Sequence, residues 1–113
     1  MEEDNKEITT AFQLQLISQI IDINKYPFTK MIIDMNITKE AYDDVFLLLE
    51  KLNQQFEIQK EEGLLDYTSL LIHFAGMLQP PFEPTATIYA LKKEGYFPQL
   101  MTTFIHILES ESE

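Results

Sequence analysis

Apolar residues recur along most of this chain at intervals of three and four, which is the spacing of one face of an α-helix. The repeat lies near 3.6 residues rather than the 2 of a half-buried β-strand. A small set of helix breakers divides the chain: Pro27, Gly63, Pro80, Pro81, Pro84, Gly95 and Pro98. The pattern predicts an all-α fold, a compact multihelical bundle of about six helices in a single domain over residues 1–113.

Local signals predict where each helix begins and ends. The expected helices span residues 5–24, 27–35, 39–62, 66–79, 84–94 and 98–108. The third is the long central helix, about 36 Å at 1.5 Å per residue, because no breaker interrupts it. Thr38 is suited to cap its start and Gly63 to follow its end, while Asp66 can cap the fourth helix. The short connections predict that sequential helices pack as neighbours.

The first expected helix has a wider apolar arc than one buried face requires. One stripe contains Ile8, Phe12, Leu16, Ile20 and Ile23, and a second beside it contains Leu14, Ile17 and Ile21. Several aromatic residues also fall in expected turns, where a monomer favours smaller polar residues. The candidate association surface comprises Phe12, Leu16, Ile20, Tyr26, Phe28 and Phe82. We therefore expect a homo-oligomer, a dimer or a trimer; in the alternative monomer, such aromatics pack helix ends into the core.

Composition supports one folded core. Of the 113 residues, 45% are hydrophobic and 12% aromatic, far more than disordered chains carry. For a compact monomer of this mass, surface scaling leaves roughly 6,400 Å² exposed to solvent.

Charge excludes two classes of partner. The chain has 19 Asp and Glu residues against 8 Lys and Arg, giving a net charge of −11. The two ends, residues 1–7 and 109–113, each sum to −3, and we expect residues 1–6 and 109–113 to be frayed acidic ends. Such a chain repels nucleic-acid phosphates and anionic membrane surfaces. No apolar run approaches the ~20 residues of a membrane-spanning helix. No nucleic acid or membrane is therefore expected as a partner.

The first residues lack the basic and then apolar pattern of a secretory signal, so we expect a cytoplasmic protein. The chain has no cysteine, which excludes disulfides, thiolate metal sites and cysteine nucleophiles.

Motifs for chemistry are missing from the sequence. Three glycines are too few and too scattered for a phosphate-binding loop or a dinucleotide fingerprint. His73 and His106 do not stand in a recognisable metal-ligand spacing. We therefore expect no catalytic residue, no cofactor and no metal site, and a protein that is not an enzyme. The alternative is a small-ligand or metal-binding helical domain with a pocket near His73 and Phe74.

Acidic residues also gather near the end of the long helix. Glu57, Glu61 and Glu62 oppose the helix dipole there, and Lys60 alone offsets them locally. This candidate acidic patch suits a basic partner or a divalent cation, or it is a solvated face. A further alternative is an acidic mimic of nucleic acid that blocks a nucleic-acid-binding protein.

Several short blocks add a resemblance. They are Lys25 to Phe28, Gln59 and Lys60 with Gly63, Leu70 and Leu71, Phe74 to Gly76 with Leu78, Thr87 and Ile88 with Ala90, Leu91 and Gly95, and Leu100 and Met101 with Phe104. Together they resemble the YhaI-like family of small Bacillus-type proteins, over about residues 8–108. The resemblance implies an all-helical, cytoplasmic domain of unknown function with no assigned site residues. Pro80, Pro81 and Pro84 depart from the family pattern and leave the geometry before the fifth helix open.

These observations together favour a non-enzymatic cytoplasmic helical protein. We expect it to associate with itself and to bind another protein through an apolar or an acidic surface.

Overall fold

The computed structural model describes the backbone of residues 2–111 and the side chains of residues 6–111. Over this range the chain forms six α-helices and one short 3₁₀ helix, and it contains no strand. The elements are α1 (Glu2–Ile20), η1 (Ile23–Lys25), α2 (Pro27–Asp34), α3 (Lys39–Glu61), α4 (Thr68–Met77), α5 (Pro84–Glu94) and α6 (Pro98–Glu111). The predictions of an all-α fold and of a long central helix are confirmed.

Local capping explains most of the helix boundaries. Thr38 Oγ1 accepts a hydrogen bond of 3.1 Å from the Ala41 amide at the start of α3. Glu83 caps α5 in the same way, with bonds to the Thr85 and Ala86 amides. At the other end of α5, Gly95 has φ +92°, a left-handed conformation that suits glycine.

The structure differs from the expected boundaries at three places. The first helix ends at Ile20, and the expected last turn is instead the separate 3₁₀ helix η1. The fourth helix is shorter than expected, although the Asp66 carboxylate accepts a hydrogen bond from the Thr68 amide at its start. At the outer ends, α1 begins at Glu2 and α6 continues to Glu111, so both helices extend into the segments 1–6 and 109–113. Residues 1, 112 and 113 lie outside the described residues.

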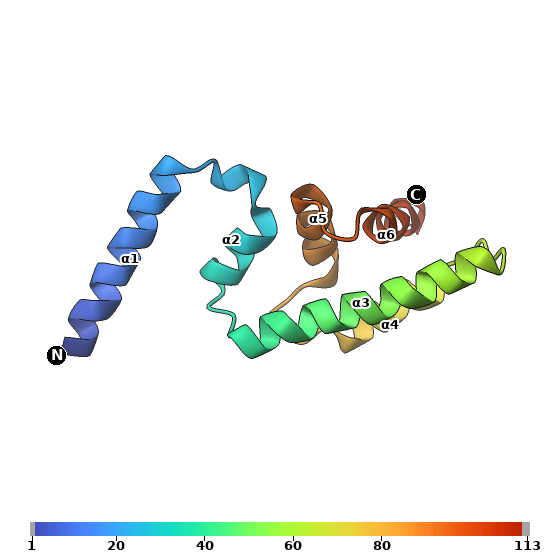
Figure 1. The fold of residues 1–113 in the computed structure, drawn as a ribbon, viewed down its shortest axis with the longest axis horizontal. Helices are drawn as coiled ribbons and strands as arrows, with labels where there is room; N and C mark the ends of the chain where they lie inside the picture. The colour runs from blue at the N-terminus through green and yellow to red at the C-terminus, as the bar shows by residue number, and fades with distance from the viewer. Residues whose placement is uncertain (1, 112–113) are drawn as a thin grey trace.

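One hydrophobic core is built from α2 to α6. Its most buried members are Phe28, Val45, Leu49, Leu52, Phe56, Leu70, Leu71, Phe74, Leu78, Phe82, Ile88, Ala90, Leu91, Leu100, Met101 and Phe104. α4 lies against α3, and α5 packs between α2 and α6 (Figure 1). The peptide bond between Pro80 and Pro81, in the connection to α5, is cis.

α1 stands apart from this core. None of its residues 6–20, whose side chains are described, is buried, and no other described helix packs extensively against it (Figure 1). The molecule is 58 Å long and 25 Å wide, with a radius of gyration of 17.0 Å, whereas about 13 Å is typical of a compact chain of this length. Its surface of 8025 Å² exceeds the roughly 6,400 Å² of a compact monomer. The expectation that α1 packs on its neighbours is therefore wrong.

Within the described residues, no helix is both long and apolar enough to cross a membrane.

Candidate functional site

Two of the six residues expected at the association surface are core residues. Phe28 is 0% exposed and Phe82 is 6% exposed, and their rings stack with centroids 6.3 Å apart. Phe28 also meets the Phe46 ring edge-on at 5.8 Å. The assignment of these two phenylalanines to the surface is corrected, because Pro27 begins α2 and Phe28 in its first turn reaches the rings of α3 and of the loop before α5.

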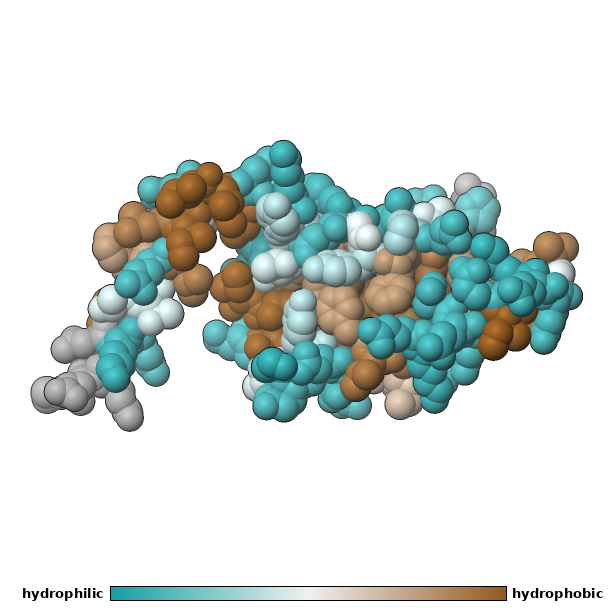
Figure 2. Space-filling view, viewed as in Figure 1, coloured by the Kyte–Doolittle hydropathy of each residue, from teal (hydrophilic) through white to brown (hydrophobic). Residues whose placement is uncertain are grey.

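The other four residues stay on the surface. On α1, Phe12 is 56% exposed, Ile20 is 81% exposed and Leu16 is also exposed; Tyr26 is half exposed beside η1. The remaining large apolar side chains of α1 are exposed as well, so the helix is apolar on more than one side. We call the whole set the α1 apolar surface: Ile8, Phe12, Leu14, Leu16, Ile17, Ile20 and Ile21. Figure 2 shows hydrophobic atoms gathered over the half of α1 that leads to η1.

A groove separates α1 from α2. Its volume is about 360 Å³, and it is lined on one side by Leu14, Ile17 and Ile21 and on the other by Ile33. Lys30 and Asp34 of α2 form an ion pair at its rim. We call this feature the α1–α2 groove. Sequence reasoning missed the contribution of Ile33, since the pattern of α2 alone does not reveal that this side is left uncovered.

A second cavity lies between α3 and the end of α4. It has a volume of about 380 Å³ and is lined mostly by apolar side chains. His73 lies at this cavity, as expected, together with Asp44 and Lys51 of α3. Phe74 does not line it, because consecutive residues of a helix point about 100° apart. Its ring is fully buried and lies 5.8 Å from that of Phe104, so its assignment to the pocket is corrected.

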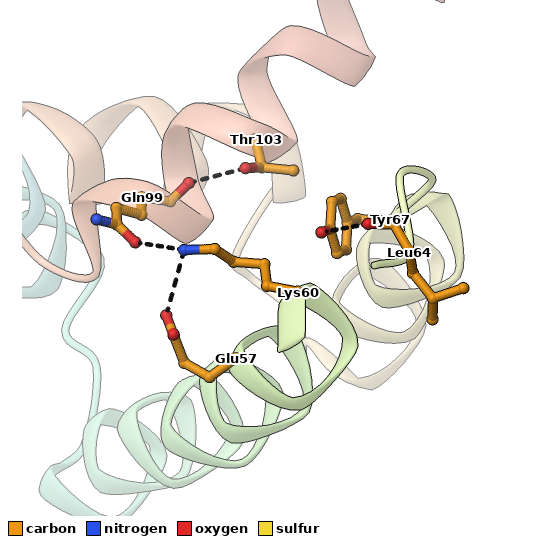
Figure 3. A network of polar contacts seen from close by, with 6 residues as sticks. All are labelled: Glu57, Lys60, Leu64, Tyr67, Gln99 and Thr103. Atoms are coloured by element: carbon orange, nitrogen blue, oxygen red, sulfur yellow. Dashed lines mark hydrogen bonds and ion pairs between the residues drawn. The ribbon is translucent and has the colours of Figure 1, made fainter. Parts of the chain in front are cut away.

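The acidic patch at the end of α3 contains a structural ion pair. Lys60 Nζ lies 4.0 Å from Glu57 Oε1 and donates a 3.1 Å hydrogen bond to Gln99 Oε1 of α6 (Figure 3). The same ammonium lies 5.2 Å from the centroid of the Phe56 ring. Lys60 therefore ties α3 to α6, and Glu57 assists it. Glu61 and Glu62 are exposed at the helix end. Among residues with described side chains, no three His, Asp or Glu converge to hold a metal ion.

Two carboxylates with lowered pKa values lie at helix starts. Hydrogen bonds from the Thr68 hydroxyl and amide lower the pKa of Asp66. Bonds from the Ala86 and Thr85 amides lower the pKa of Glu83. At the start of α3, a hydrogen bond to Asp43 raises the pKa of Lys39. All three residues lie at helix starts, and hydrogen bonds to backbone amides or neighbouring side chains explain the direction of each pKa shift.

A family model described as "Protein of unknown function (DUF1878)" matches residues 1–109 of the chain. With nearly the whole sequence covered, this all-helical protein belongs to the DUF1878 family.

Proposed function

We propose that this is a non-enzymatic helical protein that associates with itself through α1. The observation that carries the proposal is a helix of 19 residues with six large apolar side chains exposed, a seventh at Ile21 directly after it, and no extensive packing against the core helices. Helices in water gain most of their stability from packing an apolar face against another element. A second copy would supply that cover.

Measurement of the molar mass tests this proposal. We expect the full chain at tens of micromolar to elute, with light scattering detection, as a multiple of the 13.2 kDa monomer. Leu16→Glu places a charge in the α1 apolar surface and should shift the mass towards the monomer. Leu65→Glu is the matched control, because Leu65 is 95% exposed in the connection between α3 and α4, away from α1. A monomeric full chain would contradict the proposal.

A second candidate function is binding of a small apolar ligand at the His73 cavity. Its volume of about 380 Å³ falls within the range of ligand sites, and Lys51, which lines the cavity as His73 does, suits an anionic head group. A thermal-shift screen of amphipathic carboxylates tests it. A true ligand raises the melting temperature of the wild-type chain but not of Ala41→Phe, which fills the cavity. A screen in which no compound stabilises the protein would remove this candidate.

Other parts of the proposal rest on the sequence. The exposed Glu61 and Glu62 offer a contact for a basic protein partner. The residue blocks described above support a relation to YhaI-like proteins of Bacillus type, and hence a bacterial, cytoplasmic setting. Mass spectrometry after affinity capture from such a cytosol tests the protein partner.

A further inference from the structure

We infer that two copies of the chain exchange their α1 helices, so that α1 of each copy lies antiparallel in the α1–α2 groove of the other. This inference rests on the proposed self-association. It adds where α1 of the partner binds, the relative direction of the two α1 helices, and the number of copies. It makes the groove residues and Ile33 of α2 part of the contact surface.

α1 has two apolar sides, and burying both requires two contact surfaces. At 3.6 residues per turn, the stripe of Phe12, Leu16 and Ile20 lies about 130° around the helix from the stripe of Leu14, Ile17 and Ile21. The second stripe lines the groove, and the first faces away from it. A partner that covers one side alone would leave the other stripe in water.

Exchange of α1 between two copies covers both stripes. When α1 of the second copy enters the groove, the groove stripes of the two helices meet across a twofold axis. The outer stripe of the entering helix then faces α2 of the first copy, where Ile33 is 44% exposed. By symmetry the same contacts form on the other side, which gives the order α2, partner α1, α1, partner α2.

Charge favours the antiparallel direction. The charges of residues 1–7 sum to −3 in the sequence. Beyond the other end of α1, the charges of Asp22 and Lys25 cancel. Parallel helices would bring two ends of −3 together. The antiparallel arrangement instead brings the acidic end of each copy, including Glu7, towards Lys25 of its partner.

The area available matches a stable dimer. The chain exposes 8025 Å², about 1,600 Å² more than the roughly 6,400 Å² of a compact monomer. Burial of that excess by both copies removes about 3,200 Å², which is within the range of 2,000–5,000 Å² of obligate homodimers.

Engineered cysteines test where α1 of the partner binds, because the natural chain has no cysteine to interfere. Under mild oxidation, Leu14→Cys alone should form a covalent dimer, since the two groove stripes meet. A mixture of Leu16→Cys and Ile33→Cys chains carrying different tags should form the mixed dimer. Leu65→Cys serves as the control and should stay uncrosslinked.

Three outcomes would overturn the inference. Crosslinking of Leu16→Cys chains to each other without crosslinking of Leu14→Cys would show that the outer stripes pair. Crosslinking of Leu16→Cys to Met77→Cys would place the arm in the His73 cavity. A trimeric mass of the unmodified protein would exclude the twofold arrangement. In each of these cases the proposed self-association survives, whereas a monomeric mass removes both.

A charge reversal tests whether the two α1 helices are antiparallel. Lys25→Glu should raise the dimer dissociation constant about threefold at low salt, the size typical of an exposed ion pair. This difference should vanish at about 1 M salt because of screening. Lys92→Glu, on α5, makes the same change in net charge and should leave the constant unaltered. Equal constants for Lys25→Glu and wild type at low salt would contradict the antiparallel direction.

Discussion

Two phenylalanines that both stand in helices have opposite environments in this protein. Phe28 is enclosed by Phe46, Phe82 and Tyr96, while Phe12 lies on the open face of α1. Phe12 lies within a continuous helical pattern and Phe28 directly follows Pro27, but neither local setting indicates which ring is buried. Only contacts with residues far along the chain make one of them a core residue.

Substitution of each phenylalanine by alanine should reveal this difference. We expect Phe28→Ala to lower the free energy of unfolding by about 3–5 kcal/mol, because it leaves a cavity in the core. Phe12→Ala should leave the unfolding of the monomer almost unchanged and weaken self-association instead. Urea unfolding at low protein concentration measures the first effect, and light scattering measures the second. Equal loss of stability in the two variants would contradict the assigned burial.

Glu83 links the stability of α5 to pH. Amide hydrogen bonds hold its pKa below the ordinary glutamate value of about 4.3. A carboxylate with a lowered folded pKa stabilises the protein above its unfolded pKa, and this contribution is lost as pH falls through the folded value. Glu83→Gln keeps an acceptor oxygen but removes the charge.

We therefore expect Glu83→Gln to melt a few degrees below wild type at pH 7, since the charge no longer meets the helix N-terminus. The difference should shrink as the pH falls below the ordinary glutamate pKa of about 4.3 and through the lower pKa of folded Glu83, where Glu83 itself becomes protonated. Melting curves from pH 3 to pH 7 test both points. A constant difference across this range would show that the charge of Glu83 has no part in the cap.

At the scale of the element, two glycines should respond oppositely to alanine. Gly95 ends α5 with φ +92°, which an L side chain rarely adopts. Gly76 lies within α4, and a Cβ added there meets nothing within 4 Å. Gly95→Ala should therefore destabilise the protein by about 1 kcal/mol, and Gly76→Ala should stabilise it by about 0.5–1 kcal/mol. Chemical denaturation of the two variants measures the sign of each change, and equal signs would contradict the helix geometry.

The helices themselves follow from local signals, and for this reason their positions could be predicted. Thr38 caps α3, Pro27 begins α2, and Gly95 ends α5, each through atoms within four residues along the chain. The end of α1 was predicted less well. The segment after Ile20 is η1, and none of its residues is buried.

At the scale of the whole molecule, self-association should make thermal stability depend on protein concentration. Binding of a second copy to the folded state alone stabilises that state by mass action. We expect the melting temperature to rise between 5 and 500 μM protein, and Leu16→Glu to abolish most of the rise. Calorimetry at several concentrations provides the measurement. A melting temperature that is independent of concentration in the wild-type chain would argue against association in this range.

The candidate site was predicted in part. The double stripe of α1 and the cavity at His73 were accessible to sequence reasoning, since residue type and helical spacing suffice to indicate them. The places of Phe28, Phe74 and Phe82 were not, because their burial depends on packing between helices that are distant in sequence. The α1–α2 groove could not be predicted from the sequence either, because it depends on the angle that η1 sets between α1 and α2.

By itself, the sequence determined that the chain is helical and where most of its helices begin and end. These properties depend on side-chain spacing and on hydrogen bonds within a helical turn, and residues close together in the sequence set both. The tertiary structure alone decided which aromatic residues enter the core and that α1 stays outside it. Burial is a property of contacts among distant segments, and the sum of those contacts leaves one apolar helix without cover.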